Sequence, residues 1–270
     1  MNTVKDKVVV ITGAGNGIGR SLAILFANEG AKLALNSRTL ANLNETESLL
    51  NISKENLLTR AFDISKKEAV FEFANDVHEH FGRVDIVINN AGVAIGGLTF
   101  EELEIDDFEW IFSINFMGVV LNSKAFLPFL RKNKEATTLV NISSVFGLVP
   151  MVLKTPYCAT KYAVTGFTDS LRMELDNTSI NVMGVYPGGV KTGVTLNAHK
   201  AEKEPEYAKE FDKKLKMNPQ KAAQIILDAI LDKKETVIIG NDAKAAIFSH
   251  RYFPYLLKKI AQKTMQKFKN

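Results

Sequence analysis

Three residues in the second half of the chain have types and spacings suited to proton transfer: Ser144, Tyr157 and Lys161. Tyr157 and Lys161 stand four residues apart in a predicted helix, so their side chains share one face. A tyrosine hydroxyl with a pKa of about 10 is a poor base at neutral pH, and a nearby lysine ammonium favours its phenolate form. Ser144, thirteen residues before Tyr157, can hold a substrate oxygen while the tyrosine exchanges its proton. Each motif alone is common in helices and turns, but together they predict acid–base chemistry on an oxygen.

A glycine-rich loop near the N-terminus predicts a dinucleotide site. The segment from Thr12 to Gly19 reads TGAGNGIG, after a short apolar run and before a stretch of helical period. Glycines let the backbone turn sharply and approach a pyrophosphate, whose charge is favoured by free N–H groups at a helix N-terminus. Glycines are also common in tight turns that bind nothing. The position of this loop between the first strand and the first helix, however, favours a nucleotide-binding site. We assign the contact to Gly13, Asn16, Gly17, Ile18 and Gly19.

The end of the second predicted strand indicates which cofactor binds. An acidic residue there would accept hydrogen bonds from a free ribose 2′-hydroxyl, and this chain has Asn36-Ser37-Arg38-Thr39 instead. Arg38 offers a planar fork and Ser37 a hydroxyl donor to a 2′-phosphate. We therefore expect NADP(H) to be favoured over NAD(H). The alternative is that Arg38 is a solvated loop residue, or stacks on the adenine of NAD.

These motifs together resemble those of the short-chain dehydrogenase/reductase family. The glycines fit Gly-x-x-x-Gly-x-Gly, Asn89-Asn90-Ala91-Gly92 follows the fourth predicted strand, and Tyr157-x-x-x-Lys161 comes later. The resemblance continues through Asn115 and the segments 142–147 and 187–192, so it covers nearly the whole chain. It implies hydride transfer between the nicotinamide C4 of the cofactor and a carbonyl or secondary alcohol.

The resemblance also implies a role for each matched residue. Tyr157 would be the general acid/base, and Lys161 would lower its pKa and hydrogen-bond the nicotinamide ribose. Ser144 would orient the carbonyl, while Asn115 would hold a water that links Lys161 to solvent. The remaining cofactor contacts would be Asn90 and Gly92 on the adenosine side, Asp63 and Ile64 at the adenine, and Pro187, Gly188, Val190 and Thr192 at the carboxamide end.

The substrate pocket is expected to be apolar. Val145, Phe146 and Met151 follow the serine and would line it beside Ser144 and Tyr157, and residues 193–217 would form its lid by resemblance to the family. Such a wall suits a moderately hydrophobic ketone or aldehyde as substrate. An NADP(H) preference would favour reduction. The competing hypotheses are a non-catalytic NADP(H)-sensing binding protein and a membrane-surface reductase of a lipid-like ketone.

The rest of the chain alternates apolar runs with segments of helical period, as in a doubly wound α/β fold. We predict a single-domain Rossmann fold over residues 1–242: a mostly parallel seven-stranded sheet with helices on both faces. The strands are predicted at Val8–Thr12, Lys32–Leu35, Leu57–Ala61, Val84–Ile88, Leu139–Ile142, Ile180–Val185 and Thr236–Ile239. The helices are predicted from Ile18 to Phe26 and at Leu40–Leu50, Glu68–Phe81, Phe108–Arg131, Tyr157–Asp176 and Gln220–Asp232. Residues 190–218 read as charged and irregular.

Composition limits the other function classes. With 46% hydrophobic and 24% charged residues the chain can bury a core, which argues against global disorder. Its single cysteine, Cys158, excludes an intrachain disulfide framework and a cysteine-cluster zinc site. We assign no metal ligands, and the absence of a Gly-x-Ser-x-Gly motif gives little support to a serine hydrolase.

Charge is concentrated at the C-terminus. Residues 243–270 hold seven of the 34 basic residues and none of the 30 acidic ones, which leaves 27 against 30 in the rest of the chain. This basic amphipathic extension predicts either a helix packed on the subunit or a neighbour, or a peripheral contact with an anionic membrane. Nucleic acid is not expected, because the extension has one arginine and no recognised module.

Location and assembly are expectations of the same kind. The apolar run Val8–Ile11 is too short for a signal peptide, and no stretch approaches the roughly 18 apolar residues of a spanning helix. We therefore expect a cytoplasmic protein. The family resemblance implies a homodimer or homotetramer through the helices that carry Asn115 and Tyr157.

Overall fold

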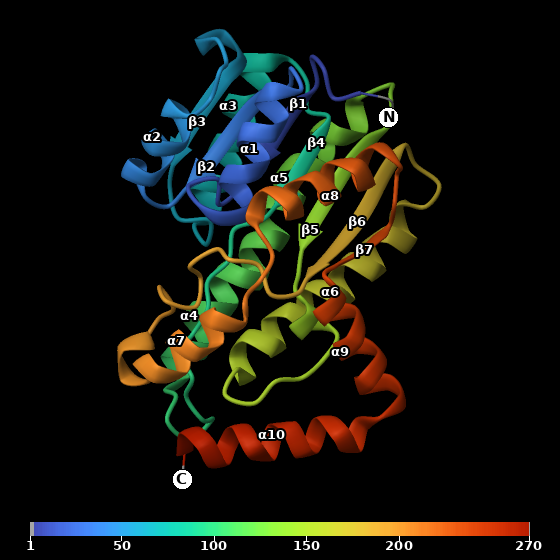
Figure 1. The fold of residues 1–270 in the computed structure, drawn as a ribbon. Coiled ribbons are helices and arrows are strands. Elements are labelled where there is room, and N and C mark those ends of the chain that lie inside the picture. Colours follow the sequence, from blue (N-terminus) through green and yellow to red (C-terminus); the bar gives the residue numbers. More distant parts are fainter. Residues whose placement is uncertain (1–2, 270) are drawn as a thin grey trace.

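In the computed structural model, which describes residues 3–269, seven strands form one sheet in the order β3-β2-β1-β4-β5-β6-β7 (Figure 1). Every neighbouring pair is parallel, so the sheet is entirely and not just mostly parallel. The order reverses between β1 and β4, and ligands of such folds bind at that switch point. The strands are β1 (Val8–Ile11), β2 (Lys32–Ser37), β3 (Leu57–Ala61), β4 (Ile86–Asn89), β5 (Thr137–Ile142), β6 (Ile180–Pro187) and β7 (Thr236–Ile239).

The strands form because their side chains are apolar on both faces. All four residues of β1 are buried; Val9 and Ile11 point into one core and Val8 and Val10 into the other. Val9 is in register with Leu33 of β2 on one side and with Ile86 of β4 on the other. Continuous apolar runs are typical of parallel strands covered by helices on both faces.

Two sets of helices cover the sheet, as Figure 1 shows. One core packs against α1, α2 and α8, the other against α3, α5 and α6. These helices are α1 (Gly17–Asn28), α2 (Leu40–Ser48), α3 (Lys67–Phe81), α5 (Gly118–Lys132), α6 (Thr155–Leu175) and α8 (Pro219–Leu231). The expected elements are all present, with ends that differ by a few residues.

The predicted helix Phe108–Arg131 is longer and is divided. It runs from α4 (Ile105–Phe112) through a π-helical turn, Ser113–Met117, into α5. By length and composition the run Ile105–Lys132 is apolar enough to cross a bilayer, so the expectation that no stretch approaches a spanning helix is wrong for this run. Half of its most apolar window is buried, and Phe126 and Leu130 of α5 lie in the core between the sheet and α3. The run Ile105–Lys132 is therefore buried in the way that is typical of a core helix.

The prediction that residues 190–218 are irregular is wrong for their second half. A 3-10 turn, Ala201–Lys203, leads into α7 (Pro205–Lys214). Pro205 occupies the first turn, where its missing N–H costs nothing. Tyr207 and Phe211, four residues apart, then turn one face toward the rest of the protein. The many charges that suggested a loop lie on the other face of this short amphipathic helix.

The C-terminal extension adds two helices, α9 (Asn241–Tyr252) and α10 (Pro254–Lys269). Figure 1 shows α10 lying across the end of the molecule that carries α7. Ala243 of α9 and Leu257 of α10 belong to the apolar cluster around Val145 and Val149. The extension is therefore folded against the main domain, although no residue of α10 is fully buried.

Candidate active site

The glycine loop after β1 is held in place by the loop after β4. Thr12 Oγ1 accepts hydrogen bonds from the backbone N–H groups of Asn90 (3.0 Å) and Ala91 (3.1 Å). Asn90 Nδ2 donates to the Thr12 carbonyl at 2.9 Å. The Asn90 side chain therefore shapes the glycine loop through Nδ2, and the adenosine contact that we expected of Asn90 stays a prediction. Thr12 was not singled out from the sequence, since its partner lies 78 residues away.

Two glycines of the loop have backbone angles that disfavour other residues. Gly13 has a φ of +66° and Gly17 a φ of +52°. A Cβ at Gly13 would lie 2.8 Å from the Cα of Ala91, and a Cβ at Gly19 would collide with the Gly13 carbonyl oxygen. The Asn16 side chain does not cap α1, so N–H groups of the first turn are available to an anion. The loop fits the pyrophosphate of a dinucleotide.

The far end of the loop meets the end of β2. Ser37 is buried and Arg38 is exposed, and within residues 3–269 the Arg38 guanidinium has no hydrogen-bond or ion-pair partner. A Cβ at Gly15 would lie 2.5 Å from Ser37 Oγ, so the loop passes close to this strand end. Asp63 and Ile64 follow β3 on the same edge of the sheet, and Asp63 Oδ1 accepts from the N–H of Ser65 at 2.9 Å.

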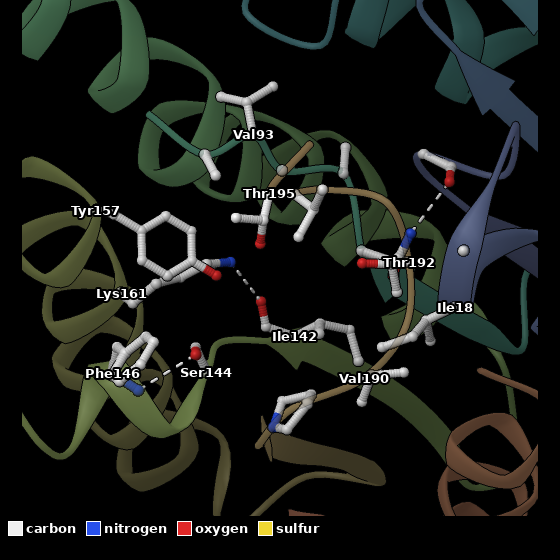
Figure 2. A pocket seen from close by; sticks show the side chains of 18 of the residues that line it. Ile18, Val93, Ile142, Ser144, Phe146, Tyr157, Lys161, Val190, Thr192 and Thr195 are labelled. Atoms are coloured by element: carbon white, nitrogen blue, oxygen red, sulfur yellow. Dashed lines mark hydrogen bonds between the residues drawn. The ribbon is translucent and has the colours of Figure 1, made fainter. Parts of the chain in front are cut away.

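Ser144, Tyr157 and Lys161 lie around one space at the carboxyl edge of the sheet. Figure 2 shows the polar ends of Tyr157, Lys161 and Thr195 directed toward it. Lys161 Nζ donates to the carbonyl of Ile142, the last residue of β5, at 3.0 Å and lies 5.8 Å from the centre of the Tyr157 ring. Ser144 Oγ accepts from the N–H of Phe146 at 3.2 Å, which leaves its own proton free to donate.

Burial governs the protonation of this pair. It raises the pKa of Tyr157 to about 12, although a hydrogen bond with Ser144 acts in the opposite direction. Burial lowers the pKa of Lys161 to about 8. Burial therefore outweighs the lowering of the Tyr157 pKa that we expected from Lys161, whose ammonium donates to the Ile142 carbonyl.

Asn115 lies in the π-helical turn and does not line the cavity. Its Nδ2 donates to the Val93 carbonyl at 2.9 Å and its Oδ1 accepts from the Val93 N–H at 2.8 Å. A Cβ on Gly92 would lie 3.4 Å from Asn115 Oδ1 and 3.6 Å from Lys161 Nζ. The glycine thus leaves room between these two side chains, where a water could link them.

One cavity of about 750 Å³ joins the glycine loop to the catalytic residues. Of the residues predicted from the sequence, all except Gly19 and Asn115 line it. They are Gly13, Asn16, Gly17, Ile18, Ser37, Arg38, Asp63, Ile64, Asn90, Gly92, Ser144, Val145, Phe146, Met151, Tyr157, Lys161, Pro187, Gly188, Val190 and Thr192. A cavity of this size with a glycine-rich wall can accept an extended dinucleotide with a substrate beside it. Among residues 3–269 no group of three or more potential metal ligands is present.

Lys154 is a site residue that the sequence analysis missed. It is 3% exposed, lines the cavity and donates from Nζ to the Ile95 carbonyl at 2.9 Å. Its ammonium lies 5.3 Å and 5.4 Å from the ring centres of Tyr207 and Phe211 in α7. Burial lowers its pKa to about 8. A lysine within an apolar segment was the available signal, but nothing in the sequence placed it under residues 193–217, the expected lid, a name that we keep for this segment.

The β6 loop and the lid contribute further residues that were missed. Asp242 Oδ2 accepts from the Gly189 N–H at 2.7 Å, and a Cβ on Gly188 would lie 2.5 Å from the same carboxylate. Thr195, at the start of the lid, is buried and lines the cavity. Ala246 and Ile260 of the C-terminal extension line it too. The extension is therefore part of the cavity wall.

Two groups of ion pairs hold the lid against α4 and α10. In the part that leads into α7, Asp107 of α4 binds His199 Nε2 (3.0 Å) and Lys200 Nζ (2.5 Å). At α7, Lys269 of α10 pairs with Glu204 and with Glu102, and Lys267 pairs with Glu210. Inside, Phe211 of α7 lies 6.3 Å from Phe146, and Phe146 lies 6.4 Å from Tyr157, both between ring centres. Aromatic contacts thus run from the lid to the catalytic tyrosine.

Comparison with known proteins agrees with this geometry. A family model described as short chain dehydrogenase matches residues 7–203. The chain is 39% identical over 250 residues to a putative oxidoreductase SadH of Mycobacterium tuberculosis, covering 91% of this chain and 90% of the relative. It is 34% identical to dehydrogenase/reductase SDR family member 7B of Xenopus tropicalis, covering 88% and 78%.

Solved structures give the same result. A short-chain dehydrogenase/reductase from Burkholderia phymatum, solved in complex with NAD, superposes with a TM-score of 0.86 at 27% identity. The match covers 95% of this chain and 97% of that one. Levodione reductase superposes with a TM-score of 0.80 at 26% identity, covering 90% and 98%.

Proposed function

The chain belongs to the short-chain dehydrogenase/reductase family of oxidoreductases, and we propose that it reduces a moderately hydrophobic ketone or aldehyde with NADP(H). The observation that carries this proposal is the single cavity shared by the glycine loop and by Ser144, Tyr157 and Lys161. When bound, the nicotinamide would supply the hydride for the carbonyl carbon. The protein's part is to position the substrate oxygen and to move a proton to it.

Each catalytic side chain has one task in this reaction. The Ser144 hydroxyl donates a hydrogen bond to the substrate oxygen, and the Tyr157 hydroxyl gives its proton to that oxygen as negative charge develops there. A pKa of about 12 keeps Tyr157 protonated at neutral pH, which is the form required for reduction. Lys161, one helical turn away, stabilises the phenolate that remains. Asn115 and the space beside Gly92 would return a proton from solvent through water.

The cofactor preference rests on the end of β2. Arg38 is exposed at the cavity wall with no acidic partner among the described residues, and Ser37 is beside it. A 2′-phosphate would give the guanidinium a partner, whereas a free 2′-hydroxyl would find no carboxylate at this strand end. The Burkholderia relative was solved with NAD, so NAD(H) is the alternative to be tested directly.

The substrate class is supported by the walls around Tyr157. Val145, Phe146 and Met151 line the cavity on one side, and Phe211 of the lid lines it on the other. Apolar walls with a few polar groups at the reacting atom are typical of pockets for largely apolar small molecules. Three polar residues on this side depart from the pattern: Lys154, Thr195 and Lys214 also line the cavity.

The first experiment titrates NADPH and NADH separately and follows the fluorescence of the reduced nicotinamide. We expect tighter binding of NADPH, and a loss of about tenfold to 100-fold in NADPH affinity in Arg38→Ala, because a charge-assisted hydrogen bond disappears. NADH binding should change little. Arg131→Ala, an exposed arginine at the end of α5, is the matched control. Equal binding of both nucleotides, indifferent to Arg38, would contradict the NADP(H) preference.

The second arm measures turnover with a panel of apolar ketones and aldehydes. Tyr157→Phe keeps the ring that packs near Phe146 and removes only the hydroxyl, so nucleotide binding should persist while the rate falls about 10²–10⁴-fold. Tyr162→Phe, an exposed tyrosine on the same helix, is the control. Wild-type protein that binds NADPH tightly but turns over no carbonyl in the panel would favour a nucleotide-sensing binding protein.

A further inference from the structure

The turn between α9 and α10 and the residues beside it expose five large apolar side chains. Phe248, Tyr252, Phe253, Tyr255 and Leu256 are between 50% and 69% exposed. Phe248 contacts the rings of both Tyr252 and Phe253, at 4.9 Å and 6.0 Å between centres, so these three side chains form a continuous patch. Tyr255 and Leu256 follow at the start of α10. We call these five residues the C-terminal corner. Contiguous exposed apolar patches commonly mark sites of interaction.

Basic side chains are mixed with this patch. The Arg251 guanidinium lies 5.7 Å from the Tyr252 ring centre, and Lys259 Nζ lies 5.0 Å from that of Tyr255. Lys258 and Lys263 are exposed nearby on α10. None of these four cations has an ion-pair partner within residues 3–269, and the chain from 243 onward contains no acidic residue. The corner therefore combines apolar surface with uncompensated positive charge.

The outer face of α10 is not needed to pack the helix on the protein. Leu257, Ala261, Thr264, Met265 and Phe268 are partly buried, and their spacing of four, three, one and three places them on the inner face. Tyr255, Lys259 and Lys263, at intervals of four, lie on the opposite face and are exposed. Lys267 and Lys269 at the far end are already paired with Glu210, Glu204 and Glu102. The free cations are thus confined to the part of α10 beside the corner.

We propose that the C-terminal corner docks the protein on an anionic lipid surface. Tyrosine and phenylalanine side chains suit the boundary between headgroups and acyl chains, and lysines and arginines beside them pair with anionic headgroups. A second copy of the chain fits less well. A two-fold contact would bring each corner against its own copy and so oppose like charges.

Docking would bring the substrate opening to the lipid. Ile260, one turn after Leu256, and Ala246 of α9 both line the cavity that contains Tyr157. An apolar substrate dissolved in the bilayer could then enter along α10. Membrane binding itself does not depend on the proposed reaction and can be tested without it.

The test is co-sedimentation of the full-length protein with phosphatidylcholine vesicles, with and without one quarter phosphatidylserine. We expect sedimentation with the anionic vesicles, little with phosphatidylcholine alone, and release at high salt, which screens the attraction. Lys258→Glu/Lys259→Glu should weaken partitioning at least about tenfold. Lys132→Glu/Lys134→Glu makes the same change of charge at the amino edge of the sheet, before β5, and should leave binding unchanged.

The apolar part of the corner is tested by Phe253→Ser/Tyr255→Ser, with Met173→Ser as the control at another exposed apolar residue. The corner variant should lose vesicle binding while its circular dichroism and NADPH affinity stay as in the wild type. Wild-type protein that stays in the supernatant with anionic vesicles would overturn the proposal. So would concentration-dependent self-association, abolished by Phe253→Ser/Tyr255→Ser, in a protein that binds no vesicles, because the corner would then be a subunit interface.

Discussion

Lys154 lies under the lid helix with its ammonium withdrawn from solvent. It has one hydrogen bond, to the Ile95 carbonyl, and two aromatic rings nearby, but no carboxylate partner among the described residues. Burial lowers its pKa from 10.5 to about 8, and Lys161 has the same direction of shift for the same reason. A lysine whose pKa is lower in the folded state binds fewer protons there than in the unfolded chain. It therefore destabilises the fold at neutral pH.

This argument predicts that the cofactor-free protein gains stability between about pH 8 and pH 10. In that window the unfolded lysines are still protonated while the folded ones are not. Lys154→Met should raise the free energy of unfolding at pH 7 by about 2 kcal/mol, since the desolvation cost exceeds one lost hydrogen bond. It should also make the rise with pH smaller. Urea unfolding between pH 7 and pH 10 measures both effects.

The control for this prediction is Lys124→Met, which changes an exposed lysine of α5. It should leave the pH dependence of the wild type intact. A Lys154→Met protein less stable than the wild type at pH 7 would show that the ammonium contributes more through Ile95 and the rings of α7 than it loses by desolvation.

The limits of sequence prediction are clearest for single residues. Ser144, Tyr157 and Lys161 could be nominated because their spacing places them on adjoining elements, and they lie around one cavity. Lys154 and Asp242 could not, because their partners, Ile95 and Gly189, are 59 and 53 residues away and no motif links them. The pKa of Tyr157 was misjudged because burial, which raises it, is a property of the packed site.

At the scale of elements, the position of the lid depends on a cluster of charged side chains and not only on apolar packing. Asp107 of α4 is buried and binds both His199 and Lys200, in the part of the lid that leads into α7. Its burial acts to raise the pKa, but hydrogen bonds from Lys200, Glu104 N–H and His199 together lower it. The carboxylate is therefore ionised at neutral pH and holds the lid against α4.

We predict that Asp107→Asn loosens the lid. Removing a buried charged partner should lower the free energy of unfolding at pH 7 by about 2–3 kcal/mol and raise the KM for the carbonyl substrate. Because the folded pKa of Asp107 is depressed, its contribution is complete above its unfolded pKa and is lost as the pH falls through the folded one. The difference between variant and wild type should therefore shrink in acid. Denaturant unfolding at pH 7 and at pH 3, with steady-state kinetics at pH 7, measures it.

Asp106→Asn is the matched control, since Asp106 is the exposed neighbour in the same helical turn. It should change stability by no more than a few tenths of a kcal/mol. An Asp107→Asn protein with unchanged stability and KM would mean that the lid is held by α10 alone, through Lys269 and Glu204.

The elements that could be predicted were those in which the buried face determines the spacing of the apolar residues. The fully buried strand Val8–Ile11 was predicted to within one residue, since apolar runs between turns have few other interpretations. The lid helix α7 was missed because its apolar face is narrow: Tyr207, Ala208 and Phe211 are buried or half-buried among charged neighbours. Its partners, Lys154 and Phe268, come from distant parts of the chain.

At the scale of the whole molecule, one face remains open in a single chain. On α6, Tyr162 is 41% exposed, and Gly166 is exposed, with open space where a Cβ would stand: nothing lies within 4 Å of that point. Met117, the last residue of the π-helical turn before α5, is 42% exposed. Phe116 and Phe167, partly buried, meet between the two helices, 6.3 Å apart between ring centres. A glycine in an exposed helix row lets a neighbouring backbone approach closely, so this face suits a partner helix.

We therefore expect two copies to associate through the face that α5 and α6 share. A two-fold contact would set Gly166 of each chain near the other, so Gly166→Glu should place two carboxylates and added bulk at its centre. The same change replaces glycine by a better helix former, so the monomer should lose no stability. Sedimentation equilibrium should give at least twice the 29.9 kDa chain mass for the wild type and about one chain mass for the variant. Met173→Glu, 80% exposed near the end of α6, should leave the assembly intact. A wild type that sediments as a single chain at all concentrations would contradict this arrangement, and the open face of α6 would then need another explanation.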